Sequence, residues 1–229
     1  MNNFHKFNSF GFDFCIMTIS LTVLILILFN IYTSFRGYND ILLFQKFHFK
    51  ISEIKKGGYY RFISSGFLHV DNQHLLFNMV TLFFFGDFVV NYVGIFLFYF
   101  IYLFCLISGN ILCYLFNYYN NNYSAVGASG AITGILFSAI LFYPDLKLAL
   151  LFLPIPMPGY FFAAIYLAYT IYGMNKQNDG IGHSAHLGGA IGGISISLLL
   201  NPSIIESSFY TLILMILIIS VGIIYLKNK

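Results

Sequence analysis

Charged side chains are scarce in this chain. Only 8% of its 229 residues are charged, whereas 59% are hydrophobic, and a typical soluble domain carries about 25% charged residues. Eleven basic and eight acidic residues leave a net charge of +3. Nineteen charged side chains cannot cover the surface of a soluble protein of this size. The outer face of the fold must therefore contact lipid. The composition excludes an ordinary soluble enzyme, a disordered protein and a basic protein that binds nucleic acid.

Tryptophan is absent and cysteine is rare. The 18 tyrosines can supply the aromatic belt that tryptophan often shares at the edges of a membrane. The three cysteines, Cys15, Cys105 and Cys113, lie in apolar runs, where a thiol behaves as a small hydrophobic group. Their odd number and spacing predict neither a disulfide framework nor a zinc site, and we expect no cofactor.

Long apolar runs make up most of the chain. A membrane-spanning helix needs about 20 apolar residues, and the runs predict seven spans at residues 14–32, 74–90, 94–116, 125–143, 160–172, 183–200 and 208–226. The predicted fold class is therefore all-α, a polytopic membrane helix bundle. We expect one membrane-embedded domain over residues 1–229, with a six-helix core at about 14–202 and an additional C-terminal span at about 208–226.

The connections between the spans also carry information. The first run is longer than the apolar part of a typical signal peptide and no small-residue cleavage site follows it, so we expect an uncleaved span. The stretch 33–71 should form short amphipathic pieces at the membrane interface. It holds six of the eleven basic residues, namely Arg36, Lys46, Lys50, Lys55, Lys56 and Arg61. The apolar stretch 146–153 is too short to span a membrane, and Pro154, Pro156 and Pro158 punctuate it. We therefore predict that it is a connection and not part of a span.

Polar residues at membrane depth are the candidates for function, because burying them is costly unless they have partners or a use. Ser129 lies in the segment Gly-Ala-Ser-Gly at the start of the fourth span. The glycines Gly127, Gly130 and Gly134 follow the spacing i, i+3, i+7. That spacing by itself favours a helix-packing face, of which a serine is an ordinary member.

His186 lies in the sixth span, where a histidine is rare and usually faces the interior of the bundle. Gly189 and Gly193 follow it at i+3 and i+7, so the histidine and a smooth glycine face point in the same direction. If this face packs on the glycines around Ser129, the imidazole can act as a base for the hydroxyl. A structural histidine bonded to a backbone carbonyl remains the alternative.

His74 and Asn78 are four residues apart and therefore adjacent on one helix face. Both side chains can donate hydrogen bonds to an oxyanion, although hydrogen bonding between helices would also account for the asparagine. A metal site built from His69, His74, His183 and His186 is a further alternative. The metalloprotease spacing is missing and only Asp71 accompanies these histidines, so we predict no metal.

Taken together, these segments resemble the rhomboid family of intramembrane serine proteases. The resemblance rests on three motifs in the family's order on the second, fourth and sixth spans, and it covers roughly residues 60–200. The motifs are H-x4-H-x3-N (His69, His74, Asn78), G-A-S-G (Gly127 to Gly130) and A-H-x2-G-x3-G (Ala185, His186, Gly189, Gly193).

The resemblance implies a rhomboid-like six-helix core and a Ser–His catalytic dyad without an acidic member. Ser129 would be the nucleophile and His186 the general base, while His74, Asn78 and the Ser129 backbone N–H would bind the oxyanion. His69 would be a structural residue, and Gly127, Gly130, Gly189 and Gly193 would support the site. The implied substrates are single-span membrane proteins with small residues at the cleavage site and a helix that unwinds readily.

Three positions depart from the family pattern. Tyr60-Arg61 stands where a Trp-Arg pair is common and should keep an amphipathic anchor. Thr133 replaces an aromatic residue that often stacks on the histidine, so we expect a less well positioned imidazole. An acidic residue late in the second span would fall near Val90, so we expect its interaction to be missing.

The family orientation places the N-terminus in the cytoplasm and the mouth of the site outside it. With seven spans this leaves Lys6 and Lys147 inside and nine basic residues outside, which is the reverse of the positive-inside rule. We follow the family and predict a multi-pass protein of a bacterial plasma membrane. The alternatives in function are an inactive rhomboid-like protein that binds client helices and, without visible inverted repeats, a transporter.

Overall fold

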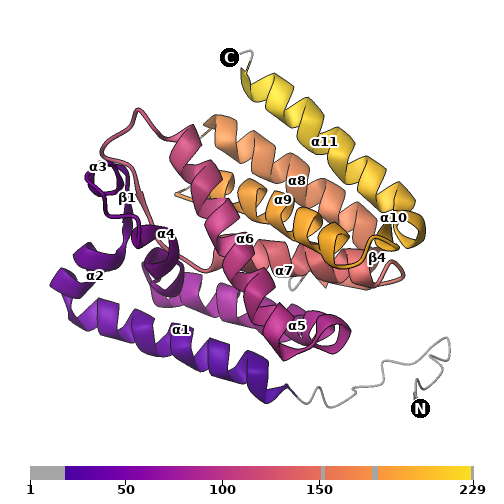
Figure 1. The fold of residues 1–229 in the computed structure, drawn as a ribbon, viewed down its shortest axis with the longest axis horizontal. Coiled ribbons are helices and arrows are strands. Elements are labelled where there is room, and N and C mark those ends of the chain that lie inside the picture. The colour runs from indigo at the N-terminus through magenta and orange to yellow at the C-terminus, as the bar shows by residue number, and fades with distance from the viewer. Residues whose placement is uncertain (1–18, 151–152, 177–179, 228–229) are drawn as a thin grey trace.

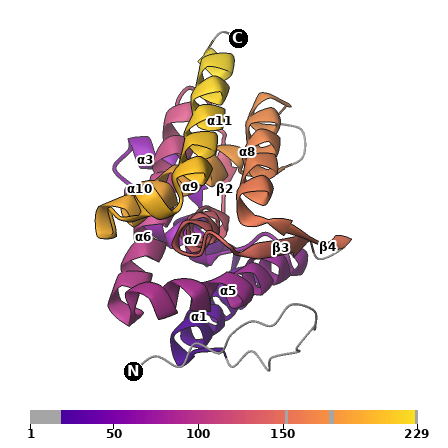
Figure 2. The same cartoon turned by 90° about the vertical axis from the view of Figure 1, so that its right-hand side faces the viewer.

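Helix α7 (Ser129–Phe142) lies at the centre of the helix bundle, and every one of its residues from Gly130 to Phe142 is buried. The computed structural model describes residues 19–150, 153–176 and 180–227. Viewed end-on, α7 is surrounded by helices α5, α6, α8 and α9 (Figure 2). A helix that is apolar on all sides has no face suited to water, and it is stable only when other helices cover it.

Six longer helices complete the bundle (Figure 1). They are α1 (Leu21–Asn39), α5 (Asn72–Val93), α6 (Ile95–Phe116), α8 (Gly159–Lys176), α9 (His183–Leu200) and α11 (Phe209–Lys227). With α7 they correspond to the seven predicted spans, and the all-α polytopic fold is confirmed. Within the described residues, five helices are long and apolar enough to cross a membrane, namely α1, α5, α6, α9 and α11.

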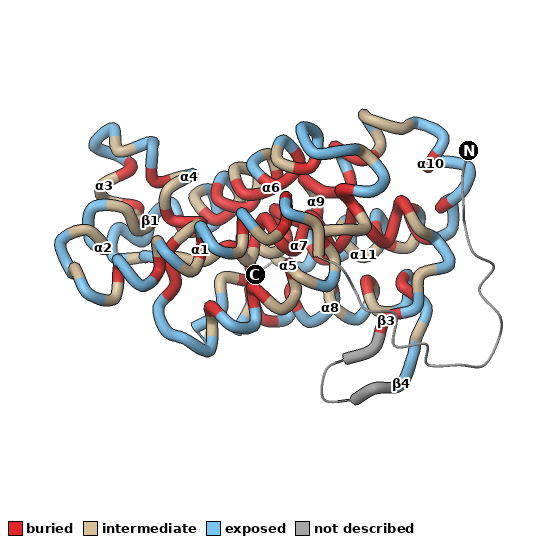
Figure 3. The backbone as a smooth tube through the Cα atoms, turned by 90° about the horizontal axis from the view of Figure 1, so that it is seen from below, coloured by how far each residue is buried: buried red, intermediate tan, exposed pale blue. Residues whose placement is uncertain are grey.

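The outer surface of the bundle is apolar, as expected of a protein that faces lipid. Phe96 is 91% exposed, and Leu28, Leu199 and Ile216 also lie largely uncovered. Buried residues concentrate instead where α6, α7 and α9 meet (Figure 3). Helix α11 packs on α8, with Gly222 against the side chain of Ile171.

The remaining elements are short and lie at the two ends of the bundle. At the end where the first long connection lies are α2 (Ile41–Phe47), β1 (Phe49–Lys50), α3 (Ile51–Lys55), α4 (Arg61–Ser64), the 3-10 helix η1 (Ser65–Phe67) and β2 (Ser124–Ala125). At the opposite end are β3 (Lys147–Leu150), β4 (Leu153–Pro158) and α10 (Ile204–Ser207). The prolines predicted to mark a simple connection therefore belong to an antiparallel hairpin of β3 and β4.

Arg61 holds the first long connection together. It is buried, and its Nη1 donates to the carbonyl oxygens of Gln45 (3.0 Å) and His48 (2.6 Å). Tyr60 donates from its hydroxyl to the carbonyl of Lys46 and stays half exposed. The sequence predicts that the pair Tyr60-Arg61 is an amphipathic anchor. In the structure the two residues differ, because Arg61 is buried and binds backbone carbonyls, whereas Tyr60 lies at the surface.

Several predicted boundaries differ from the structure, and α8, for example, ends at Lys176 and not at residue 172. Helix α1 continues to Asn39, seven residues beyond the predicted end, because the polar side chains of Thr33 and Ser34 bond to the carbonyl of Phe67 instead of ending the helix. Its predicted first residues, 14–18, and Cys15 with them, lie outside the described residues. Helix α7 begins at Ser129 and not at residue 125, because Ala125 pairs with Phe49 in a short strand.

A carboxylate does act late in the second span, although not at the position near Val90 where the family pattern has an acidic residue. Asp87 lies on α5 one turn before Val90. Its carboxylate accepts hydrogen bonds from the backbone N–H (2.9 Å) and the hydroxyl of Ser20. Asp87 thereby anchors the beginning of α1 to the end of α5.

Candidate active site

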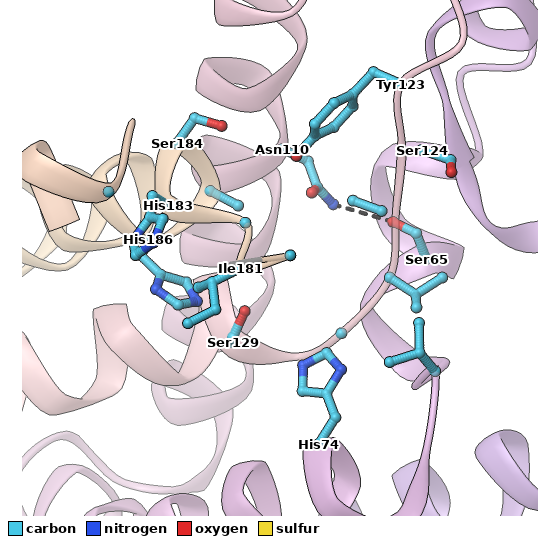
Figure 4. Close-up of a pocket in the computed structure, with 18 of the residues that line it drawn as sticks. Ser65, His74, Asn110, Tyr123, Ser124, Ser129, Ile181, His183, Ser184 and His186 are labelled. Carbon is cyan, nitrogen blue, oxygen red and sulfur yellow. Dashed lines mark hydrogen bonds between the residues drawn. The ribbon is translucent and has the colours of Figure 1, made fainter. Parts of the chain in front are cut away.

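A cavity of about 830 Å³ lies at the end of the bundle that carries the first long connection. Its walls come from the start of α5, the end of α6, the segment before α7 and the start of α9. Ser129, His186, His74 and Asn78 all line it, and Figure 4 shows the first three around one space. The structure therefore brings together the four polar residues that the sequence places on three different spans.

Ser129 is the first residue of α7. The first N–H groups of a helix have no partner within the helix, so the backbone N–H of Ser129 is available as a donor. The chain reaches this point through Gly127, whose φ of +129° turns the backbone sharply before the helix begins. The serine is half-buried at the wall of the cavity, and Figure 4 shows it near His186 and Ile181, which line the same cavity.

Glycines bring the helices of Ser129 and His186 into backbone contact. A Cβ atom on Gly130 would lie 3.1 Å from the carbonyl oxygen of Ala185, and these two residues are the chain neighbours of Ser129 and His186. One turn beyond Ala185 on α9, Gly189 lies against the backbone of Gly130. Two turns beyond it, Gly193 lies against the backbone of Gly134 in the same way. The predicted glycine contact between α7 and α9 is thus observed.

Helix α6 joins the same crossing, which the sequence analysis did not predict. Gly109 lies against the carbonyl of Ala185, and Gly188 lies against the carbonyl of Ser108. The signal was present in the run Ser108-Gly109-Asn110 of an otherwise apolar helix. A third helix therefore packs against the crossing of α7 and α9, next to the residues that flank Ser129 and His186.

Gly127 does not belong to this packing face, because it lies outside α7. Instead it faces His74 and Asn78. A Cβ atom at Gly127 would lie 2.6 Å from Cε1 and 2.7 Å from Nε2 of the His74 ring, and 3.7 Å from Nδ2 of Asn78. The spacing i, i+3, i+7 that placed it on a helix face was therefore misleading, and the residue instead leaves room for the imidazole.

The donors His74 and Asn78 occupy the wall opposite His186. Both lie in the first two turns of α5, and Asp71 caps this helix by accepting a hydrogen bond from the backbone N–H of His74 (2.7 Å). Asn78 is only 7% exposed, and its Nδ2 donates to no described residue. A buried amide donor without a partner costs free energy, which is the situation expected of a group that binds a ligand atom.

His69 connects three segments around the cavity. Its Nδ1 lies 2.8 Å from the Ser34 hydroxyl on α1, and its Nε2 accepts from the backbone N–H of Ala128 (3.5 Å). Burial and the neighbouring His74 lower the pKa of His69 to about 3. The ring is therefore neutral at physiological pH and can accept a hydrogen bond at Nε2. This arrangement agrees with the supporting role that the family resemblance implies.

His186 has an aromatic neighbour that the sequence analysis missed. The ring of Tyr166 on α8 stacks on the His186 ring with centroids 6.1 Å apart, and its hydroxyl lies 2.9 Å from Oγ1 of Thr133. Thr133 brings no ring of its own, but an aromatic ring from a different helix contacts the imidazole, and Thr133 binds that ring through its hydroxyl.

The four histidines proposed as an alternative metal site form two pairs. The rings of His69 and His74 are 4.9 Å apart, and those of His183 and His186 are 6.0 Å apart. Across residues 19–150, 153–176 and 180–227, no three His, Cys, Asp or Glu side chains are grouped closely enough to hold a metal ion.

The family model of the Rhomboid domain matches residues 56–203, which include every cavity residue discussed above. The chain belongs to the rhomboid family. The match begins in the first long connection and ends just after α9, so it covers the helices that build the cavity and leaves α1 and α11 outside.

Curated relatives of this rhomboid include two proteins of Arabidopsis thaliana and one human protein. It is 28% identical over 176 residues to RHOMBOID-like protein 12, mitochondrial, of Arabidopsis thaliana, covering 70% of this chain and 52% of that protein. It is 32% identical over 136 residues to the human Presenilin-associated rhomboid-like protein, mitochondrial, covering 57% and 35%. It is 28% identical over 175 residues to Rhomboid-like protein 11, chloroplastic, of Arabidopsis thaliana, covering 72% and 58%. The matched region thus spans between about a third and three-fifths of these relatives' length.

Proposed function

We propose that this rhomboid is an intramembrane serine endopeptidase that hydrolyses peptide bonds in or near the transmembrane segments of other membrane proteins. The observation that carries the proposal is the convergence of Ser129, His186, His74 and Asn78 on one cavity inside a lipid-facing bundle. The partners are then the substrate helix and the surrounding bilayer. A cleaved helix must unwind, because a regular helix shields its peptide carbonyls by hydrogen bonding and side chains.

The position of Ser129 supports hydrolysis at membrane depth. Helix α7 has 14 residues and a length of about 20 Å, whereas the hydrocarbon core of a bilayer is about 30 Å thick. If the end of α7 at Phe142 reaches one edge of the core, Ser129 lies about 10 Å below the other. The polar cavity above it supplies the water that hydrolysis requires.

The proposed reaction follows acyl-transfer chemistry. The Ser129 hydroxyl attacks the scissile carbonyl while His186 takes its proton, and the oxyanion accepts hydrogen bonds from the Ser129 N–H, Asn78 and His74. His186 then gives the proton to the leaving amine as the C–N bond breaks. A water molecule, deprotonated by His186, attacks the acyl-enzyme. His186 then returns this proton to the Ser129 oxygen as the ester C–O bond breaks and the second product leaves.

The test uses the full chain purified in detergent, a fluorophosphonate probe and a single-span substrate. We expect Ser129→Ala to abolish labelling and cleavage, and His186→Ala to slow both by at least about 100-fold. Asn78→Ala should reduce cleavage on the order of 100-fold, because one oxyanion donor contributes about 3 kcal/mol. Ser184→Ala is the matched control, since it removes another hydroxyl from the same cavity and should leave both rates unchanged.

Two results would refute the proposal. Equal labelling of the Ser129→Ala variant and the unmodified chain would remove Ser129 as the nucleophile. An unmodified chain that captures a substrate helix but neither cleaves it nor reacts with the probe would instead be the inactive rhomboid-like binding protein.

The membrane in which this rhomboid works is also a proposal. The predicted location is a bacterial plasma membrane, whereas the relatives described above carry mitochondrial and chloroplastic names. We retain the plasma membrane, with the cavity mouth on its outer side. Fractionation of the source cells with marker proteins for each membrane decides between these locations.

A further inference from the structure

His186 lines the cavity, and its stacking contact with Tyr166 is a feature of the site that the proposed reaction does not yet use. The ring planes are inclined by 29° with centroids 6.1 Å apart, and the two residues belong to adjacent helices, α8 and α9. A general base has to hold one orientation while it takes and returns a proton, and a third group commonly sets that orientation. In α7 and α9, no Asp or Glu is present to do so.

Tyr166 is itself fixed from three sides. Its hydroxyl bonds to Oγ1 of the buried Thr133, which lies one turn beyond Ser129 on α7. The ring of Phe137 contacts it edge-on with centroids 6.0 Å apart, and the ring of Phe162 stacks on it at 6.3 Å. Two of these three contacts come from α7, the helix that carries Ser129, and the third comes from α8 itself.

We propose that Tyr166 is the positioning residue of His186 and that Thr133, through its bond to the tyrosine hydroxyl, sets the position of the Tyr166 ring relative to Ser129. This proposal rests on the proposed function. The stacked ring restricts rotation of the imidazole about its side-chain torsions. Its π face also stabilises the positive charge that His186 acquires when it takes the serine proton.

The test compares Tyr166→Leu, Tyr166→Phe and Thr133→Val with the unmodified chain. The rate of labelling by a small fluorophosphonate reports on Ser129 and His186 without requiring a substrate helix to bind. We expect Tyr166→Leu to lower the labelling rate and kcat about tenfold with KM unchanged. Tyr166→Phe keeps the ring and should retain most of the rate, with a loss of about threefold that Thr133→Val reproduces.

A double variant tests the link between the two side chains. If Thr133 acts through the tyrosine hydroxyl, Tyr166→Phe combined with Thr133→Val should lose no more rate than either single change. Additive losses would show that Thr133 acts independently, and would overturn that half of the proposal.

A control separates positioning from stability. Leu167 is the fully buried chain neighbour of Tyr166, so Leu167→Ala should lower the unfolding temperature while leaving the labelling rate of the folded protein unchanged. A normal labelling rate in Tyr166→Leu, or an equal loss in Leu167→Ala, would overturn the role of Tyr166 alone. Absence of any Ser129-dependent labelling in the unmodified chain would overturn the proposed function as well.

Discussion

At the scale of single residues, Gly127 combines two requirements that no other residue type meets. Its φ of +129° lies in the left-handed region, where a Cβ atom is strained, and the space that a Cβ would occupy is filled by the His74 ring. Gly94 has a similar conformation, with φ +82°, but nothing lies within 4 Å of its missing Cβ. The two glycines therefore separate backbone strain from disturbance of the site.

Gly127→Ala should cost activity out of proportion to stability. Both Gly127→Ala and Gly94→Ala are expected to lose about 1–2 kcal/mol of folding free energy through left-handed strain. Only the first adds a methyl group that displaces His74, so its kcat should fall at least about tenfold while Gly94→Ala keeps the unmodified kcat. Steady-state cleavage measures kcat, and the unfolding temperature measures the change in stability. Equal kcat values for the two variants would contradict a role of Gly127 in placing His74.

The sequence predicts the polar members of the site better than the aromatic one. Ser129, His186, His74 and Asn78 can be recognised because polar side chains are conspicuous in apolar helices. Tyr166 cannot, since α8 carries several tyrosines and its rotation about its own axis depends on packing against α7, α9 and α11. Sequence spacing specifies the face shared by residues of one helix, but it does not specify the neighbour that this face meets.

At the scale of the elements, the site depends on how closely α6, α7 and α9 approach one another. Small residues let helix backbones meet, and in a bilayer this close packing replaces the hydrophobic effect as the source of helix association. Gly189 faces the carbonyl of Gly130 without space for a side chain. Gly182, at the start of the same helix, has only the Cβ of Ala185 at 3.9 Å.

Gly189→Ala should separate α7 from α9. We expect a loss of about 3 kcal/mol or more, which corresponds to a decrease on the order of 10 °C in unfolding temperature. Cys105 and Cys113 are fully buried, so a thiol-reactive dye reports unfolding once Cys15 is replaced by serine. Gly182→Ala adds the same methyl group at the N-cap of α9, away from the crossing, and should leave the transition unchanged. A similar decrease in both variants would show that the loss does not come from separation of the helices at the crossing.

The number and order of the long helices could be predicted from apolar runs alone, whereas several boundaries could not. Thr33 and Ser34 look like the polar end of a span, yet they satisfy their hydroxyls on the Phe67 carbonyl and, for Ser34, on His69, and α1 continues. Phe49 and Ala125 pair in a short two-stranded sheet although they are far apart in the sequence, and no local pattern predicts such a pair. Contacts between distant segments decide these features, and they are invisible to periodicity.

At the scale of the whole molecule, charge is distributed unequally between the two ends of the bundle. The end with the cavity carries eight of the described basic residues: Arg36, Lys46, Lys50, Lys55, Lys56, Arg61, Lys176 and Lys227. At the opposite end, Lys147 is the single Lys or Arg among the described residues. The positive-inside rule would place the cavity mouth in the cytoplasm, whereas the proposed orientation places it outside.

Cysteine accessibility in sealed vesicles of known sidedness tests the orientation. Tyr119 is 94% exposed between α6 and β2 at the cavity end, and Asp145 is exposed in the turn after α7 at the other end. In a background with Cys15 replaced by serine, a membrane-impermeant thiol reagent should modify Tyr119→Cys only from the outer side and Asp145→Cys only from the cytoplasmic side. The reverse pattern would show that the basic residues, and not the orientation shared by the family, determine insertion. Modification of both cysteines from the same side would contradict the arrangement of α7 itself, because this helix joins the two ends.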